Sequence, residues 1–233
     1  MKIFVGTSGW QYSWNPDGLE WYLKNTKLNA IELNSSFYRF PFPNQVKGWK
    51  NKMKIKEIRW SIKVNRLITH VFKLNEKALN VWEKFEKMFK PLEEYIDFYL
   101  FQLPPKFKPN LEKIKNFVKE TNLKEKLALE VRNVEWFNEK VLEELKSLEI
   151  TFVGVDAPYY ENLPREIFNI NNIVYLRMHG RTEWYSHCYT EKELKEVAEK
   201  IKVSKAEKVY VFFNNNHAML ENAEKMIEIL WKK

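Results

Sequence analysis

The segment VYLRMH (174–179) carries Arg177 and His179 two residues apart in an otherwise apolar run. Side chains at this spacing in a strand point to the same face, so we expect the two to lie side by side. An imidazole exchanges protons near neutral pH, which makes His179 a candidate general acid or base. A buried cation is costly without an anionic partner. The pair therefore predicts carboxylates from other parts of the chain beside it.

Polar residues also stand where the other short apolar runs end. Because the C-terminal ends of parallel barrel strands meet at one mouth, residues from different runs can form a single site there. Glu130 and Asp156 carry carboxylates that could orient His179 or activate a water molecule. The candidate catalytic residues are therefore His179, Glu130 and Asp156. The remaining polar residues at these ends are Glu32, Asn34, Lys63, Gln102, Arg132 and Asn214.

Cations near these ends predict an anionic ligand, phosphate first. An arginine guanidinium binds two phosphate oxygens at once, whereas lysine supplies a single point of charge. Aromatic side chains nearby could stack on a base. The predicted substrate contacts are Lys63, Arg132, Arg177, Arg181, Asn34, Gln102, Asn214, Trp10, Tyr38 and Trp184. The alternative is that the arginines form buried Arg–Glu pairs that stabilise the interior.

A divalent metal is the one cofactor that the residue types suggest. Carboxylates and an imidazole at strand ends suit Mn²⁺, Mg²⁺ or Zn²⁺ in a hydrolytic site. Against this, the sequence has no H-x-H or H-E-x-x-H spacing, and the neighbouring cations can neutralise the same carboxylates. The candidate ligands are Glu32, Glu130, Asp156 and His179.

Short apolar runs alternate with amphipathic helical patterns along the chain. The runs are mostly apolar on both faces, which is typical of parallel strands covered by helices. They span residues 2–8, 29–34, 58–64, 96–102, 127–131, 150–156, 173–179 and 208–214. Helical spacing of apolar residues occurs at 76–89, 110–120, 138–148, 190–201 and 217–231. Between the sixth and seventh runs, Pro158 and Pro164 leave room only for a short turn of helix.

Eight strands separated by helical crossovers predict a single-domain (β/α)8 TIM-type barrel over residues 1–233, with polar residues at the C-terminal strand ends. The competing fold is an open doubly wound α/β sheet, which usually begins with a glycine-rich phosphate-binding turn. The first turn here, GTSGW (6–10), does not match G-x-G-x-x-G. The barrel is therefore the predicted fold.

The composition is that of a globular protein, with 45% apolar and 30% charged residues in a chain of 233. No apolar run approaches the ~18 residues of a membrane span, and the first residues lack the pattern of a signal peptide. The one cysteine, Cys188, cannot form an internal disulfide. We expect a cytoplasmic protein without a membrane partner. The net charge of +8 would attract an anion, but it also fits the lysine- and glutamate-rich surface of a heat-adapted protein.

Several motifs together resemble the YecE-like proteins, the family known as domain of unknown function seventy-two. They are GTSGW (6–10), ELNSSFYR (32–39), LITH (67–70), FQLPP (101–105), LEVRN (129–133), LRMHGR (176–181) and FFNN (212–215). The resemblance extends from Gly6 to about Ala223. It implies a barrel fold and a pocket that the motif residues share, and it brings no established reaction.

The leading hypothesis for function is a hydrolase acting on a phosphate-bearing substrate, either a nucleotide or single-stranded nucleic acid. The first alternative is a non-catalytic module that binds nucleic acid through its basic surface and aromatic residues. The second is a carbohydrate-active enzyme that uses Glu130 and Asp156 as its pair of carboxylates. The expected partner is accordingly an anionic small molecule or a nucleic acid strand. The oligomeric state is left open.

Overall fold

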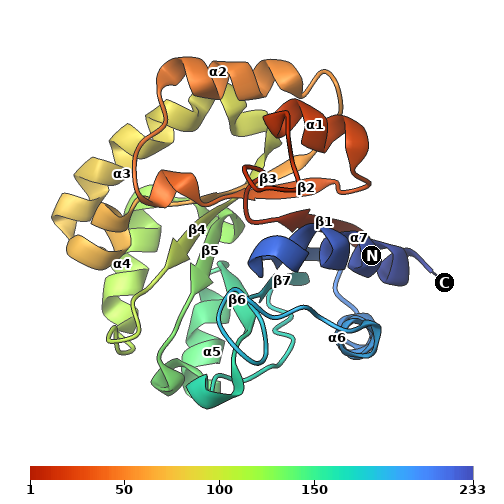
Figure 1. The fold of residues 1–233 in the computed structure, drawn as a ribbon. Helices are drawn as coiled ribbons and strands as arrows, with labels where there is room; N and C mark the ends of the chain where they lie inside the picture. Colours follow the sequence, from red (N-terminus) through yellow and green to blue (C-terminus); the bar gives the residue numbers. More distant parts are fainter. Residues whose placement is uncertain (233) are drawn as a thin grey trace.

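Eight parallel strands close into one barrel in the computed structural model, which describes residues 1–232 (Figure 1). Each strand pairs with the next along the chain, and β8 pairs with β1 over six residues to close the ring. The strands are β1 (Lys2–Thr7), β2 (Ala30–Leu33), β3 (Arg59–Lys63), β4 (Ile96–Gln102), β5 (Leu127–Glu130), β6 (Thr151–Asp156), β7 (Ile173–Met178) and β8 (Lys208–Phe213). The predicted TIM-type barrel is confirmed. Lys233, the last residue of the predicted domain, lies outside the described residues.

The helices form a ring around the strands (Figure 1). They are α1 (Gly18–Asn25), α2 (Pro43–Lys52), α3 (Glu76–Phe89), α4 (Leu111–Thr121), α5 (Glu139–Ser147), α6 (Glu191–Val203) and α7 (Met219–Trp231). The last five match the helical patterns found in the sequence, whereas α1 and α2 were not predicted. Between β6 and β7 the described chain has only the short 3-10 helix η6 (Tyr159–Glu161), as the two prolines predicted.

Apolar stripes hold the helices against the strands. On α3 the stripe is Trp82, Phe85 and Phe89, each at most 2% exposed. Side chains at this spacing lie on one helix face, and their burial removes a large apolar area from water. Asn75 caps the start of α3 by accepting a hydrogen bond from the backbone N–H of Ala78.

Alternate residues of each strand point into the barrel, so the interior is built in layers. An apolar layer is formed by Ala30, Phe98, Leu100, Ala128, Val153, Ile173, Tyr175, Tyr210 and Phe212. Two residues further along their strands, Ala30 is followed by Glu32, Ala128 by Glu130 and Tyr175 by Arg177. Because the side-chain period of a strand is two, these charged residues form the next layer toward the C-terminal mouth.

In the part of the chain that the structure describes, no helix combines the length and the apolar character needed to span a membrane.

Candidate functional site

Arg177 is the centre of a buried charge network at the C-terminal end of the barrel. Its guanidinium binds both carboxylate oxygens of Glu32, with Nε–Oε2 at 2.9 Å and Nη2–Oε1 at 2.6 Å. Its Nη1 also donates to Oε2 of Glu130 at 2.5 Å. The Arg177 side chain is 1% exposed, and those of both glutamates are fully buried. Charges so deeply buried are tolerated only because they pair with each other.

Glu32 accepts two further hydrogen bonds. The hydroxyl of Ser8 donates to Oε1 at 2.7 Å, and the hydroxyl of Tyr175 donates to Oε2 at 2.7 Å. Tyr175 is in turn 2.7 Å from the hydroxyl of Ser61 on β3. Ser8, directly after β1, and Tyr175 on β7 thus fix the Glu32 carboxylate, and Ser61 on β3 supports Tyr175. The prediction that carboxylates would lie beside Arg177 is therefore confirmed by its contacts with Glu32 and Glu130.

Arg132 follows β5 and extends the network toward solvent. Its guanidinium pairs with Glu130 and donates from Nη2 to Nε2 of His179 at 2.9 Å. The indole of Trp184 lies over the guanidinium, with Cζ 4.3 Å from the ring centroid, a cation–π contact. The Arg132 side chain is 10% exposed, so this arginine can meet a ligand at the mouth whereas Arg177 cannot.

His179 is fully buried and contacts both arginines. Its Nε2 faces two donors, Arg132 at 2.9 Å and Arg177 at 3.2 Å, so Nε2 carries the lone pair and the ring is neutral. Burial and the charges of Arg132, Arg177 and Lys63 hold the pKa of His179 well below its usual value. The side-chain nitrogen Nδ2 of Asn214 lies 3.3 Å from Nδ1 of His179. Rotation of the Asn214 amide by 180° would place its oxygen there as an acceptor for the proton on Nδ1. Asn214 thus lies in the predicted site, as a partner of His179.

Lys63 ends β3 and is half-buried. Ser61 points into the barrel, because its hydroxyl contacts Tyr175, and Lys63, two residues on, shares that face. Its Nζ lies 4.4 Å from the ring centroid of Phe37. Within residues 1–232 no carboxylate lies within ion-pair distance of Nζ. The two nearby carboxylates, Glu32 and Glu130, are bound by arginines instead. Lys63 is therefore the cation at the mouth whose charge is not paired.

The Glu130 carboxylate responds to this excess of positive charge. Burial raises the pKa of Glu130, but the charges of Arg132, Arg177 and Lys63 outweigh burial and lower it to about 2. Glu130 is consequently ionised at neutral pH. With His179 neutral, the layer contains two carboxylates and three cations, which leaves one positive charge uncompensated.

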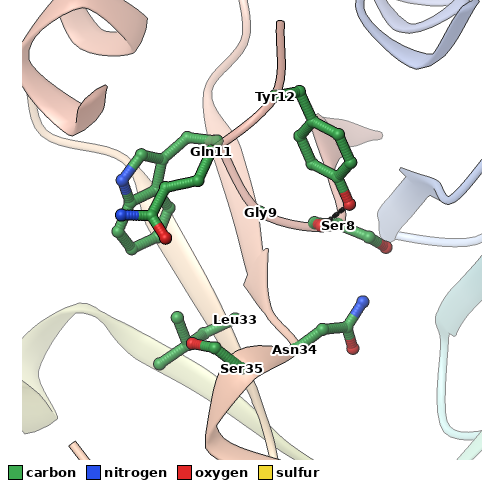
Figure 2. Close-up of a pocket in the computed structure, with 8 residues that line it drawn as sticks. Ser8, Gly9, Gln11, Tyr12, Leu33, Asn34 and Ser35 are labelled. Atoms are coloured by element: carbon green, nitrogen blue, oxygen red, sulfur yellow. Dashed lines mark hydrogen bonds between the residues drawn. The ribbon is translucent and has the colours of Figure 1, made fainter. Parts of the chain in front are cut away.

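A cavity of about 180 Å³ opens at the ends of β1 and β2, next to this network. Its walls are formed by Ser8, Gly9 and Tyr12 on one side and by Leu33, Asn34 and Ser35 on the other (Figure 2). Ser8 joins the cavity to the network through its hydrogen bond to Glu32. Tyr12 donates to the backbone carbonyl of Ser8 at 3.0 Å, and burial together with the charge of Glu32 raises its pKa. The cavity can therefore receive a polar group next to the charged layer.

Asp156 and Arg181 do not lie in the mouth, and their predicted positions need correction. Val153 of β6 points into the barrel, so Asp156, three residues on, points outward toward α6. There it binds Nε of Arg181 at 3.0 Å and accepts from the hydroxyl of Tyr189 at 3.0 Å. Burial raises the pKa of Asp156 in spite of the arginine. Arg181 also pairs with Glu196 of α6 at 2.9 Å, so the two form a structural link between sheet and helix.

The other predicted contacts divide into two groups. Asn34 lines the cavity, and Trp184 covers Arg132. Trp10 borders the cavity but is only 6% exposed and packs edge-on against Trp49 and Trp60. The Tyr38 side chain is 74% exposed, and Nε2 of Gln102 donates to the backbone carbonyl of Leu103. Tyr38 therefore points to solvent, whereas Gln102 shares the inner face of β4 with Leu100. Within residues 1–232 neither side chain forms a hydrogen bond with the charged layer.

The four candidate metal ligands are not brought together. Residues 1–232 contain no group of three or more His, Cys, Asp or Glu side chains placed to hold a metal ion. Asp156 lies on the opposite face of the sheet, and guanidinium groups already occupy the oxygens of Glu32 and Glu130. As arranged, this donor set does not fit a divalent cation.

Sequence reasoning missed Tyr175. In VYLRMH it looks like one more aromatic core residue, and its ring does pack against Phe98 and Phe212. Its hydroxyl nevertheless fixes Glu32. The available signal was its spacing of two residues from Arg177, which places both side chains on the inner face.

The fold and the polar layer at its C-terminal end define a TIM-barrel protein whose site is built from strand ends. The chain belongs to the family described as "Protein of unknown function DUF72", whose model matches residues 4–233. No curated protein matches the chain.

Solved structures agree with this family. A DUF72 family protein from Thermotoga maritima is similar at 27% identity and a TM-score of 0.82, covering 99% of both chains. One from Enterococcus faecalis is 21% identical with a TM-score of 0.83, covering 98% of this chain and 95% of the other. A D-psicose 3-epimerase from Clostridium cellulolyticum, solved with D-tagatose, reaches a TM-score of 0.59 at 11% identity, covering 99% and 98%. At that identity the likeness concerns the fold alone.

Proposed function

We propose that the barrel mouth binds a phosphate-bearing small molecule, such as a nucleotide, and that the protein hydrolyses it. The observation that supports this proposal is the uncompensated positive charge of the mouth, where Lys63 has no carboxylate partner among the described residues. An anion bound there would complete the charge balance of the layer. A phosphate also offers oxygens for the exposed edge of Arg132.

The predicted cations take different roles in this proposal. Lys63 and Arg132 contact the anion, because both reach the mouth. Arg177 does not touch it, because its guanidinium is buried and holds Glu32 and Glu130. Arg181 is on the outer face with Asp156 and has no part in binding.

Phosphoryl transfer needs little covalent help from the protein and depends mainly on positioning and on stabilisation of negative charge. Two cations at the mouth supply that stabilisation. His179, buried and neutral, acts as a positioning residue for Arg132 in this scheme, because its Nε2 accepts from the Arg132 guanidinium. This replaces the direct proton transfer that the sequence suggested.

A small molecule is favoured over a nucleic acid strand. The cations lie inside the mouth, and the Arg132 side chain is only 10% exposed, whereas single-strand binders track the backbone along an open basic groove. The carbohydrate alternative loses its pair of carboxylates, because Asp156 and Glu130 lie on opposite faces of the sheet.

Calorimetric titration of the wild-type protein with inorganic phosphate, nucleotides and sugar phosphates tests the binding. Replacing Lys63 by methionine removes one charge at the mouth, and we expect phosphate affinity to fall at least about tenfold, or 1.4 kcal/mol. The matched control is Lys146→Met, which removes the same charge from the exposed surface of α5.

Equal affinities of the two variants would contradict the binding site. The hydrolytic step is measured separately, as release of phosphate from each ligand that binds. A ligand bound through Lys63 but left intact under all conditions would contradict hydrolysis and leave the binding site standing.

A further inference from the structure

The Lys63 amine has an environment different from that of a surface lysine. Its side chain faces the interior of the barrel at the end of β3, and its Nζ lies over the ring of Phe37 at 4.4 Å. The residue as a whole is half-buried at the mouth. A lysine becomes nucleophilic when its ammonium form is destabilised by burial or by a neighbouring cation. Burial and the Arg177 guanidinium act on Lys63 in this way, and the cation–π contact with Phe37 opposes them.

Charged groups from several elements face this amine. Burial and the Arg177 guanidinium lower the pKa of Lys63 to about 8, Arg132 adds to the effect, and Glu130 and Glu32 oppose it. The π-helix η2 (Leu67–Val71) contributes His70, whose own pKa is lowered to about 4 by burial and by the charges of Lys63 and Arg66. The neighbours that act on the amine are Arg177, Arg132, Glu130, Glu32 and His70.

The hydrogen bonds of the network explain why neither glutamate captures the lysine. Arg177 occupies both oxygens of Glu32 and one of Glu130, while Arg132 takes the other oxygen of Glu130. An ordinary lysine near two carboxylates would be locked as an ammonium ion in a salt bridge. Here the arginines, which stay charged at every relevant pH, leave the amine unpaired and able to lose its proton near neutral pH.

We propose that the Lys63 amine forms an imine with the carbonyl carbon of an aldehyde or ketone bound at the mouth. This activity goes beyond the hydrolysis proposed above and uses the same residue, Lys63, as a nucleophile toward a carbonyl group instead of as a charge beside an anion. A substrate that suits both proposals carries a phosphate for Arg132 and a carbonyl group for Lys63.

The step is balanced without any further reactant. The nitrogen lone pair attacks the carbonyl carbon, and the electron pair of the C=O bond moves to oxygen, which takes a proton from water. The nitrogen then loses a proton, the hydroxyl group takes a proton and leaves as water, and the nitrogen lone pair forms the carbon–nitrogen double bond. The product is the protonated imine, which becomes the neutral imine when it releases the second nitrogen proton to water. The first step needs the free amine, which is the minor form at neutral pH but is more abundant for Lys63 than for a lysine at the ordinary pKa.

Reductive trapping tests the proposal on the intact protein. The wild type is incubated with glycolaldehyde, a neutral carbonyl probe, or with dihydroxyacetone phosphate, each together with cyanoborohydride, which reduces an imine to a stable secondary amine. Peptide mapping by mass spectrometry then measures the labelling rate at every lysine. We expect Lys63 to be labelled at least about tenfold faster than the exposed Lys146 near pH 7, because the lowered pKa makes its free-amine share more than about a hundredfold larger than that of a lysine at the ordinary pKa, and the lower nucleophilicity of a less basic amine offsets only part of this gain. The rate at Lys63 should level off above about pH 8.

The comparison between Lys63 and Lys146 is made within one molecule, so it does not depend on whether a variant folds. Labelling of Lys63 no faster than that of Lys146 would overturn the proposal. Lys63→Arg should lose the label at this position and leave that at Lys146 unchanged. The two proposals fail separately: Lys63 labelled by glycolaldehyde in a protein that does not bind inorganic phosphate would refute phosphate binding and support the imine.

Discussion

At the residue scale, the central fact is that one arginine satisfies two glutamates. Arg177 binds Glu32 through two nitrogens and Glu130 through a third, so its planar fork organises the whole layer. A lysine could not replace it, because a single ammonium lacks this geometry. Removal of one partner from such a network leaves another charge buried and unpaired, which costs more than the pair contributed.

Glu130→Gln tests this dependence. The substitution leaves Arg132 and Arg177 with an uncompensated charge, so we expect the free energy of unfolding to fall by about 3 kcal/mol at pH 7. The measurement is equilibrium denaturation in urea. The matched control is Glu149→Gln, which breaks an exposed pair with Lys124 and should have a far smaller effect.

The same variant predicts a pH dependence. The pKa of Glu130 in the folded protein, about 2, is below the value of 4.5 for a free side chain. The ionised carboxylate therefore stabilises the fold above about pH 4.5, and this contribution of about 3 kcal/mol is lost as the pH falls toward 2. The stability difference between wild type and Glu130→Gln should shrink over that interval. A difference that stayed constant down to pH 2 would show that Glu130 is not held by these cations.

At the scale of elements, the segment after β7 places an aromatic cover on the site. His179 ends the run of inward-facing residues, and the chain then turns at Gly180 with φ +114°. The turn leads to Trp184, which lies over Arg132 and donates from its indole to Glu161 at 2.8 Å. A residue with a side chain is strained at such a φ.

Gly180→Ala should displace the turn that holds Trp184 over Arg132. The added Cβ would lie 2.6 Å from the carbonyl oxygen of Glu183, in addition to the strain of the positive φ. We expect a loss of about 1–3 kcal/mol in the free energy of unfolding and a change in Trp184 fluorescence. The control is Gly48→Ala within α2, where the Cβ meets nothing within 4 Å. An alanine in a helix interior should stabilise the protein there by about 0.5–1 kcal/mol. Equal effects at the two glycines would contradict this interpretation of the turn.

At the scale of the whole molecule, closure of the barrel requires β1 to pair with both of its neighbours, β8 and β2. Pairing of β1 with β8 extends over six residues, whereas the register of β1 with β2 covers only Gly6–Ala30 and Thr7–Ile31. The short pairing of β1 with β2 also brings Ser8 next to Glu32, so barrel closure and the geometry of the site both depend on this strand pair.

Gly6→Ala should weaken the pairing of β1 with β2. The added Cβ would lie 2.2 Å from the carbonyl oxygen of Ala30, which is backbone and cannot rotate away. We expect the free energy of unfolding to fall by about 3 kcal/mol, at the upper end of overpacking effects. Thermal denaturation followed by circular dichroism measures it. A midpoint temperature equal to that of the wild type would contradict the prediction, because it would mean that β1 and β2 can move apart to admit the methyl group without loss of stability.

The fold was largely predictable from particular segments. The run 58–64 and the observed strand Arg59–Lys63 differ by one residue at each end, and the pattern at 76–89 coincides with α3. The helices α1 and α2 were missed, because α1 has only eight residues and α2 buries only Val46, so neither shows a long apolar stripe. The propensity signal of such short helices is weak, and packing decides them.

The site was predicted in part, and the difference between Arg177 and Asp156 shows why. Spacing along β7 placed Arg177 and His179 on one face, since the period of a strand is two whatever surrounds it.

The sequence by itself thus determined the strands, their order in a barrel and which side chains of each strand share a face. It did not determine which face of β6 points inward, because a strand buried on both sides is apolar on both and shows no alternation. Tertiary structure decided that Asp156 meets Arg181 outside the barrel, that Glu32 and Glu130 meet Arg177 inside it, and that Lys63 is left without a partner. Such pairings depend on strand register and barrel closure, which bring together residues as distant in sequence as Glu32 and Arg177, 145 positions apart.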